Sequence, residues 1–137
     1  MIEWNSDYLT GIDEIDLQHQ YFAKLINRIE AKITSIALAE GHSPLLTELV
    51  YYARFHFLSE ENIMAEAGYP ALDDHKGLHS ELIQRLNNEL HMLEGDLVEP
   101  AHMVEMLGSW FREHTLVEDR KYAEFIGHHH GQTGAIN

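Results

Sequence analysis

Apolar residues recur at intervals of three and four along four stretches of this chain, a spacing that predicts four amphipathic helices. The first is expected to begin at Asp13, a candidate N-cap, and to end at about Ala39. In the break that follows, Ser43 is expected to cap the second helix and Pro44 to occupy its first turn.

The second helix is predicted to end at the corner formed by residues 68–70, where Gly and Pro interrupt the pattern. The third helix follows this corner, and the fourth begins after Pro100 and is expected to stop near Gly127. Residues 1–11 have no clear period and are expected to form an arm. Its candidate anchors are Trp4 and Tyr8. Short connections favour antiparallel neighbours, so the sequence predicts an all-α, up-down-up-down four-helix bundle with an N-terminal arm.

Composition narrows the possible functions. A length of 137 residues fits one domain, expected over residues 1–127, followed by a flexible, His-rich tail over residues 128–137. The net charge of -14 disfavours nucleic acid and anionic membranes as partners. No apolar run is long enough to span a bilayer and no secretion signal is apparent, which predicts a cytoplasmic protein. The chain has no cysteine, so a metal would be held by imidazole and carboxylate, which suits iron, zinc or manganese.

Two pairs of metal-type side chains lie on either side of the 68–70 corner. His56 and Glu60 are four residues apart, as are His75 and His79, and this spacing stacks each pair on one helix face. Both pairs are in phase with the apolar stripes of their helices. Glu60 is the most informative of them, because a carboxylate on a core stripe is costly to bury without a partner.

Two further histidines fall on the stripes of the first and fourth helices. His19 is in phase with the first stripe, and His114 with the fourth, where Val117 is also expected to face inward. Asp119 follows His114 by five residues, so a regular helix would turn it about 140° away. We therefore predict a π-bulge or similar distortion between His114 and Asp119, because such distortions tend to mark functional sites.

Each of these signals has an ordinary explanation when it is taken alone. A lone core histidine is more often a hydrogen-bonded structural residue than a ligand, and one pair could arise by chance in a chain with 11 histidines. Together, the buried imidazoles and carboxylates would strongly destabilise the core unless something compensates them. A metal is the simplest compensation.

This pattern resembles the hemerythrin family, and the arm with Trp4 and the segment DEIDLQHQ are similar to single-domain bacteriohemerythrins. The resemblance covers nearly the whole chain up to about Phe125. The residues that carry it are His19, His56, Glu60, His75, His79, His114 and Asp119. It implies two iron ions, one held by the histidines of the third and fourth helices and one by those of the first and second, with both carboxylates bridging.

The ligand set also implies a function. Two irons offer about twelve coordination positions. The five histidines, the two bridging carboxylates and one oxo or hydroxo bridge between the irons would fill all but one of them. A single open position fits end-on binding of a diatomic molecule. We therefore expect a non-catalytic protein that binds O2 reversibly, for transport, storage or sensing.

The residues around the open position affect this expectation. Trp110, Phe22 and Phe57 are candidate walls of a dry pocket, although they could equally be ordinary core aromatics. The family usually has a branched apolar residue after the histidine that stands here as His114, whereas this chain has Thr115. Its hydroxyl could bind oxygen or admit water. This makes a di-iron enzyme acting on peroxide or nitric oxide an alternative function. A third alternative, independent of Thr115, is a helical interaction module with adventitious metal.

Overall fold

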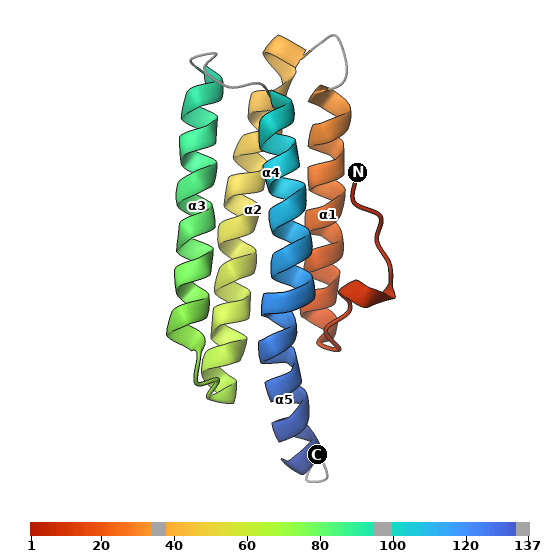
Figure 1. Cartoon of the computed structure of the whole chain (residues 1–137), viewed down its shortest axis with the longest axis vertical. Helices are drawn as coiled ribbons and strands as arrows, with labels where there is room; N and C mark the ends of the chain where they lie inside the picture. Colours follow the sequence, from red (N-terminus) through yellow and green to blue (C-terminus); the bar gives the residue numbers. More distant parts are fainter. Residues whose placement is uncertain (34–37, 95–99, 134–137) are drawn as a thin grey trace.

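The computed structural model describes the backbone of residues 1–33, 38–94 and 100–133, and the side chains of residues 1–32, 44–92 and 101–127. A short 3-10 turn, η1 (Ser6–Tyr8), and a π-helical segment, η2 (His114–Glu118), accompany the α-helices. The α-helices are α1 (Asp13–Ile33), α2 (Leu38–Ala67), α3 (Leu72–Glu94), α4 (Pro100–Glu113) and α5 (Asp119–Thr133). Because α4, η2 and α5 follow one another without a break, they form one rod beside the other three helices (Figure 1). The predicted all-α four-helix bundle is confirmed.

The first connection differs from its prediction. Helix α2 already begins at Leu38, so the expected helix end at Ala39 and the cap at Ser43 are wrong, and Pro44 lies inside α2. Proline removes one helical hydrogen bond. Pro44 is exposed near the start of this long helix, so water can serve the carbonyl group that loses its partner.

Asp13 does not cap α1 as expected, and a different acid, Asp16, ties the arm to the start of this helix. Asp13 is the first helical residue, and the carboxylate of Asp16 accepts hydrogen bonds from the backbone N–H of Thr10 at 2.7 Å and of Gly11 at 3.2 Å. The Thr10 hydroxyl also donates to Asp16, at 2.8 Å. The arm therefore turns into the bundle at a fixed point.

The corner between α2 and α3 ends α2 as predicted. Gly68 has φ +70°, a conformation that favours glycine, and its N–H donates to the carbonyl of Ala65. The N–H of Tyr69 reaches back to the carbonyl of Met64 at 3.0 Å. These two bonds make a Schellman motif, which ends α2 about two turns after Glu60 and brings the start of α3 alongside it.

The last helix is longer than expected. It continues past Gly127 to Thr133, so the predicted end near Gly127 is wrong. The side chains of the tail predicted for residues 128–137 lie outside the described part of the chain. No helix in the described ranges is both long enough and apolar enough to cross a membrane.

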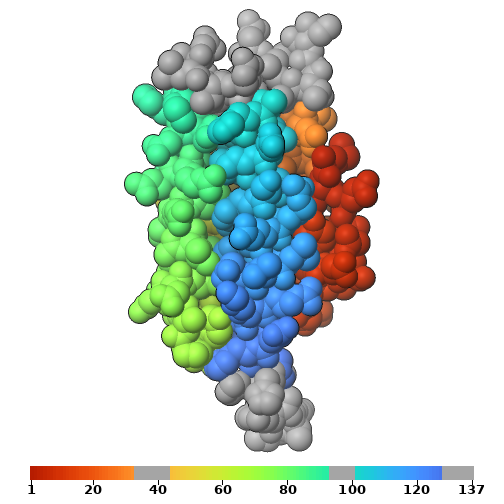
Figure 2. All heavy atoms as spheres, in the orientation of Figure 1, coloured from red at the N-terminus to blue at the C-terminus, as the bar shows by residue number. Residues whose placement is uncertain are grey.

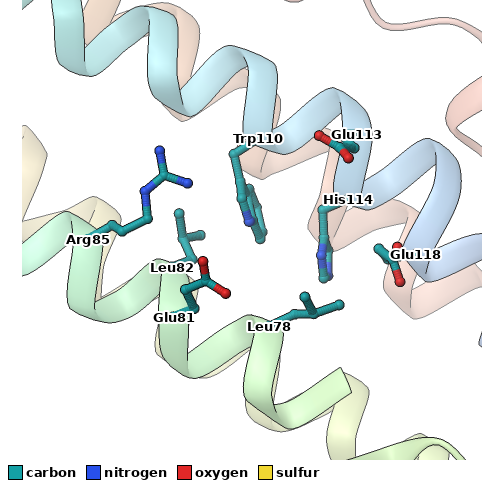
Figure 3. A pocket seen from close by; sticks show the side chains of 8 residues that line it. All are labelled: Leu78, Glu81, Leu82, Arg85, Trp110, Glu113, His114 and Glu118. Atoms are coloured by element: carbon teal, nitrogen blue, oxygen red, sulfur yellow. The ribbon is translucent and has the colours of Figure 1, made fainter. Parts of the chain in front are cut away.

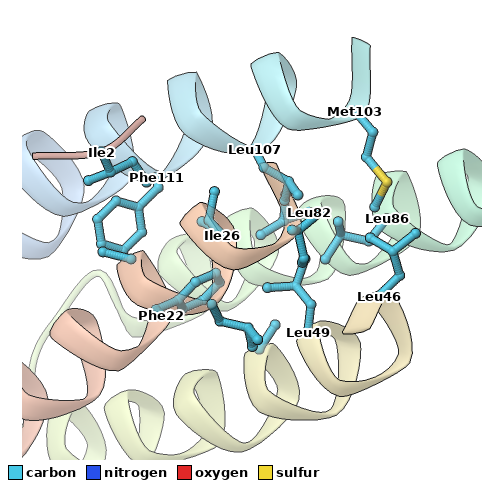
Figure 4. Close-up of a cluster of buried hydrophobic side chains, with 14 of the residues drawn as sticks. Ile2, Phe22, Ile26, Leu46, Leu49, Leu82, Leu86, Met103, Leu107 and Phe111 are labelled. Carbon is cyan, nitrogen blue, oxygen red and sulfur yellow. The ribbon is translucent and has the colours of Figure 1, made fainter. Parts of the chain in front are cut away.

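The interior of the bundle is apolar toward the end where α4 begins. Leucine and methionine side chains from α2, α3 and α4 meet there around Ile26 of α1 (Figure 4). The buried residues of this region include Leu46, Leu49, Leu82, Leu86, Met103 and Leu107. Each buried side chain of this size contributes about 1.5–3 kcal/mol, so this cluster supplies much of the drive for folding.

The N-terminal arm lies against the side of the bundle (Figure 2). Its expected anchors are in place: Trp4 stacks on Tyr8 with ring centroids 5.0 Å apart, and the buried Tyr8 contacts Phe111. Ile2 is a further anchor, because it is buried and its backbone N–H and C=O both bond to the side chain of Asn27. The arm therefore covers part of the bundle beside Phe111.

Candidate metal centre

All seven residues that carried the resemblance point into the bundle and are at most 4% exposed. They come from every long helix. His19 lies in the second turn of α1, His56 and Glu60 in the second half of α2, and His75 and His79 near the start of α3. The last two, His114 and Asp119, are the first residue of η2 and the first residue of α5.

These residues form two groups that share both carboxylates. Within each group, one potential ligand atom per residue lies within 4.8 Å of the others. One group consists of His19, His56, Glu60 and Asp119. The other consists of His75, His79, His114, Glu60 and Asp119. The division into two histidines and three histidines, with the carboxylates in common, is the arrangement that the resemblance implied.

Asp119 divides its two oxygens between the groups. Its Oδ1 lies 3.0 Å from Nε2 of His75 and 3.0 Å from Nε2 of His114. Its Oδ2 lies 3.0 Å from Nε2 of His19. One carboxylate can therefore face two ions at once.

Glu60 reaches both groups with a single oxygen. Its Oε1 lies 3.2 Å from Nε2 of His56 and 3.3 Å from Nε2 of His79. The second oxygen, Oε2, accepts a 2.5 Å hydrogen bond from the hydroxyl of Tyr122 and lies 3.7 Å from Nε2 of His19. Tyr122 thus fixes Glu60 through its second oxygen and leaves Oε1 facing His56 and His79.

Several of these atoms lack hydrogen-bonding partners although they are buried. In the described part of the chain they include His19 Nε2, Glu60 Oε1 and Asp119 Oδ2. Buried polar atoms without partners cost free energy, so their convergence calls for a ligand. Two ligands bound at right angles about 2.1 Å from one ion lie about 3.0 Å apart, which matches the spacing seen here. The donor set and its spacing fit metal ions.

The link from His114 to Asp119 confirms the predicted helix distortion. η2 is a π-helix, and the N–H of Asp119 donates to the carbonyl of His114, five residues earlier. The extra residue turns Asp119 into the interior. The same residue turns Val117 outward, where it is 48% exposed, so the prediction that Val117 faces the core is wrong.

The charges of the two carboxylates are partly offset within the cluster even without metal. Burial opposes protonation of His19, but the nearby Asp119 and Glu60 outweigh it and raise the pKa of His19 to about 10. Burial also works against ionisation of the two carboxylates, but the surrounding histidines hold both of their pKa values below the usual range. Burial lowers the pKa of His56, which favours its neutral, ligating form.

Three polar residues that sequence reasoning missed hold the candidate ligands in place. Gln18 Oε1 accepts a 2.7 Å hydrogen bond from Nδ1 of His56, and Glu61 Oε2 a 2.8 Å bond from Nδ1 of His79. Tyr122 donates to Glu60, and burial raises the pKa of Tyr122, so its phenol stays protonated. The available signal was adjacency, since Gln18 precedes His19, Glu61 follows Glu60, and Tyr122 lies three residues after Asp119.

The candidate pocket walls lie against the imidazoles. Trp110 stacks on His114 with centroids 4.5 Å apart, and Phe57 stacks on His79 at 4.0 Å. Phe22 is buried 5.9 Å from His56. A further ring, Phe111, stands edge-on to His19 at 6.1 Å and was not singled out from the sequence.

Thr115 lies next to His114 in η2 and is 3% exposed.

On the three-histidine side, a pocket of about 210 Å³ opens beside the stacked rings of Trp110 and His114 (Figure 3). Leu78 closes its floor, and Arg85 and several glutamates line its mouth. The cluster is therefore approached most closely by solvent at His114.

Sequence comparisons place these features in a known family. Residues 10–126 match the family model described as "Hemerythrin HHE cation binding domain". The chain is 32% identical to a bacteriohemerythrin of Stenotrophomonas maltophilia over 133 residues, which cover 96% of this chain and 86% of the relative. A bacteriohemerythrin of Clostridium acetobutylicum is 29% identical over 90% of this chain and 100% of its own length. A third, from Pseudomonas aeruginosa, is 29% identical over 91% of this chain and 81% of its own length.

The matched region contains every residue of the two groups, and the fold is the one that the family requires. Hemerythrins are non-haem proteins with a di-iron centre, which agrees with a cluster able to hold two ions. The chain belongs to the hemerythrin family.

Proposed function

We propose that this chain holds two iron ions between its seven clustered side chains and binds O2 reversibly there, as a carrier, store or sensor rather than as an enzyme. The observation that carries the proposal is the pair of groups that share Glu60 and Asp119. When bound, the irons would supply the electrons and the open coordination position that O2 requires. His19 and His56 would hold the ion with the open position, because that group has one histidine fewer.

Hydrogen bonds behind the ligands would keep this site rigid. Because His56 and His79 donate through Nδ1, each directs the lone pair of Nε2 toward the carboxylates. The Tyr122 hydroxyl holds Glu60 on its other side. These partners make the histidines and Glu60 stronger ligands. They would keep the same ligands on both metal ions.

The aromatic residues would exclude water from the open position. Phe22, Phe57, Trp110 and Phe111 pack against one another or against the imidazoles, and three of them are at most 3% exposed. Water and protons promote the irreversible oxidation of iron by O2. A dry aromatic wall therefore supports reversible binding.

Reversibility is the property to measure. The reduced, iron-loaded protein is exposed to O2 and then purged with inert gas, while its optical spectrum is followed. Recovery of the initial spectrum over repeated cycles is the expected result. If the protein stays oxidised after the first exposure, reversible binding is contradicted. Metal analysis of the same sample should give two irons per chain, and zinc or manganese in their place would contradict the cofactor.

The buried hydroxyl of Thr115 favours a second function, turnover of peroxide or nitric oxide at the same irons. A hydroxyl beside His114 could hold a proton or a water molecule where an apolar residue could not. Turnover of peroxide or nitric oxide well above that of free iron, and lost in Thr115→Val, would support it. Equal rates in the two proteins would exclude this role for Thr115.

A cytoplasmic location and the absence of nucleic-acid partners stay predictions from the charge and composition of the chain. The net charge of -14 supports the second of these, because an acidic protein repels the phosphates of nucleic acid. A binding assay with labelled duplex DNA at low salt would test the second of these directly.

A further inference from the structure

An apolar face on the outside of α1 and α2 has no role in the candidate metal centre. Its large side chains are between 39% and 70% exposed. We call it the α1–α2 face, and it consists of Leu17, Tyr21, Tyr51, Phe55 and Leu58. These five are most of the large exposed hydrophobic residues in the described part of the chain.

Helix geometry makes this face continuous. Tyr51, Phe55 and Leu58 follow one another by four and three residues, so they share one side of α2, and Leu17 and Tyr21 do the same on α1. α1 and α2 lie side by side (Figure 1). The ring of Tyr52 joins the two rows, with centroids 4.9 Å from Tyr21 and 6.0 Å from Phe55.

The α1–α2 face is as large as the largest apolar patches that monomers usually leave open. If a full side chain of this kind exposes about 200 Å², the five residues present roughly 600 Å² to solvent. The largest apolar patch on a monomer is about 300–600 Å² and is often functional. A stable interface buries about 800 Å² on each partner, so this face with its polar rim is large enough to form one.

Charge indicates which partner fits. The chain carries -14 overall, yet one basic and one acidic side chain, Arg28 and Glu48, lie beside Tyr21 in this face. The face is therefore nearly neutral on an otherwise acidic molecule. A strongly basic partner would find a more complementary surface elsewhere on this acidic chain, and a strongly acidic partner would find none. A second copy of the chain would meet a matching apolar and neutral face here.

The rim is also self-complementary. Glu14 and Arg28 lie at equal distances along α1 on either side of Tyr21, about two helical turns each way. A two-fold axis near Tyr21 would set α1 antiparallel to the same helix of another copy. Each Glu14 would then face the Arg28 of the other chain, as an isologous interface requires.

We propose that the α1–α2 face binds a second copy of this chain to form a symmetric dimer. The contact would cover the ring of Tyr52, which stacks against His56 and donates a 2.8 Å hydrogen bond to the carbonyl of Gln18. Gln18 in turn bonds to His56, so dimer formation would seal the outer side of the two-histidine group. The dimer itself does not depend on the function proposed for the irons.

Sedimentation equilibrium of the full chain tests the proposal, with and without bound metal. We expect the wild-type mass to approach twice that of one chain as concentration rises, and Phe55→Glu to remain a monomer with unchanged helix content by circular dichroism. The matched control is Leu9→Glu, at a residue of similar exposure on the arm, which should dimerise normally. A wild-type monomer at all concentrations, or a Phe55→Glu dimer, would overturn the proposal.

The register of the dimer has its own test. Glu14→Arg and Arg28→Glu should each weaken dimerisation by about threefold to tenfold, and the double variant should recover it. Failure of the double variant to recover would overturn the two-fold arrangement.

Discussion

The interior of the bundle differs between its two ends. The end where α4 begins is filled by leucine and methionine side chains, with Glu89 as its buried exception, 3.4 Å from His102. The end near the α2–α3 corner instead holds five imidazoles and two carboxylates, all buried. Inward positions recur every three or four residues at both ends, except where η2 adds one residue between His114 and Asp119. The main difference between the ends is the chemistry of the inward side chains.

This difference separates two sources of stability. Apolar burial stabilises the first end without any cofactor. At the other end, burial of the charged groups costs desolvation, which their attraction for one another and bound metal must offset. We infer that the apolar end holds the fold while the metal holds the site.

The largest effect should come from removing the oxygen that both groups share. Glu60→Ala deletes the Oε1 that lies near both His56 and His79, so both ions lose a ligand. We expect metal content to fall from two ions per chain to less than one, and the melting temperature to become insensitive to a chelator. Glu66→Ala, an exposed neighbour on α2, is the control and should retain both ions. Full metal content in Glu60→Ala would contradict the shared bridge.

A change at the apolar end should have the opposite signature. Leu86 is fully buried, and Leu86→Ala should lower the free energy of unfolding by about 2–5 kcal/mol through lost burial and the cavity left behind. The loss should be similar with and without metal, and metal content should not change. Denaturant unfolding of both forms measures it, with the exposed Asn87→Ala as control. If Leu86→Ala lost metal, and its metal-free form were as stable as the metal-free wild type, the two ends would not be independent.

Sequence reasoning reached the candidate site because its residues obey helix periodicity. His56, Glu60, His75 and His79 were placed by their spacing of four and their phase with leucines, and the structure brings them together. Even the π-helix was predictable, since Asp119 could not otherwise turn inward. Periodicity therefore predicts which side of a helix a residue occupies, provided that the helix is regular.

The errors arise where regularity is interrupted. Val117 was expected inside by counting three residues from His114, but the extra residue of η2 shifts that count. The tolerance of Pro44 within α2 depends on its exposure, which sequence does not report. Gln18 and Tyr122 were missed because their role depends on atoms of other helices, at 2.7 Å and 2.5 Å. Such partners follow from packing, not from spacing.

A smaller effect is expected from the support behind one ligand. Gln18→Ala removes the acceptor for Nδ1 of His56, and loss of such a partner weakens metal binding by about 10- to 100-fold. The ion held by two histidines should be lost first in competition with a chelator, while the other stays. Gln18→Glu keeps an acceptor at this position and should retain the wild-type affinity. Equal loss of both ions in Gln18→Ala would argue against separate groups.

The last effect is a response to pH. As pH rises, the stability of the metal-free protein and that of the metal-loaded protein should change in opposite directions. Without metal, the folded-state pKa of His19 is raised from 6.5 to about 10, so its charge stabilises the fold below pH 6.5, and this contribution is lost between pH 6.5 and 10. The lowered pKa values of Glu60 and Asp119 contribute nothing to this change, because both stay ionised throughout the window.

The metal-free protein should therefore lose at most about 1.4 kcal/mol for each pH unit across this window. The metal-loaded protein should not lose it, because metal requires His19 to be neutral and binds more tightly as pH rises. Thermal unfolding of both forms at pH 6.5, 8 and 9.5 checks the sign. Parallel curves for the two forms would mean that His19 has the same protonation state in both, and hence that it does not bind metal. Diverging curves would place His19 among the ligands by a measurement independent of O2.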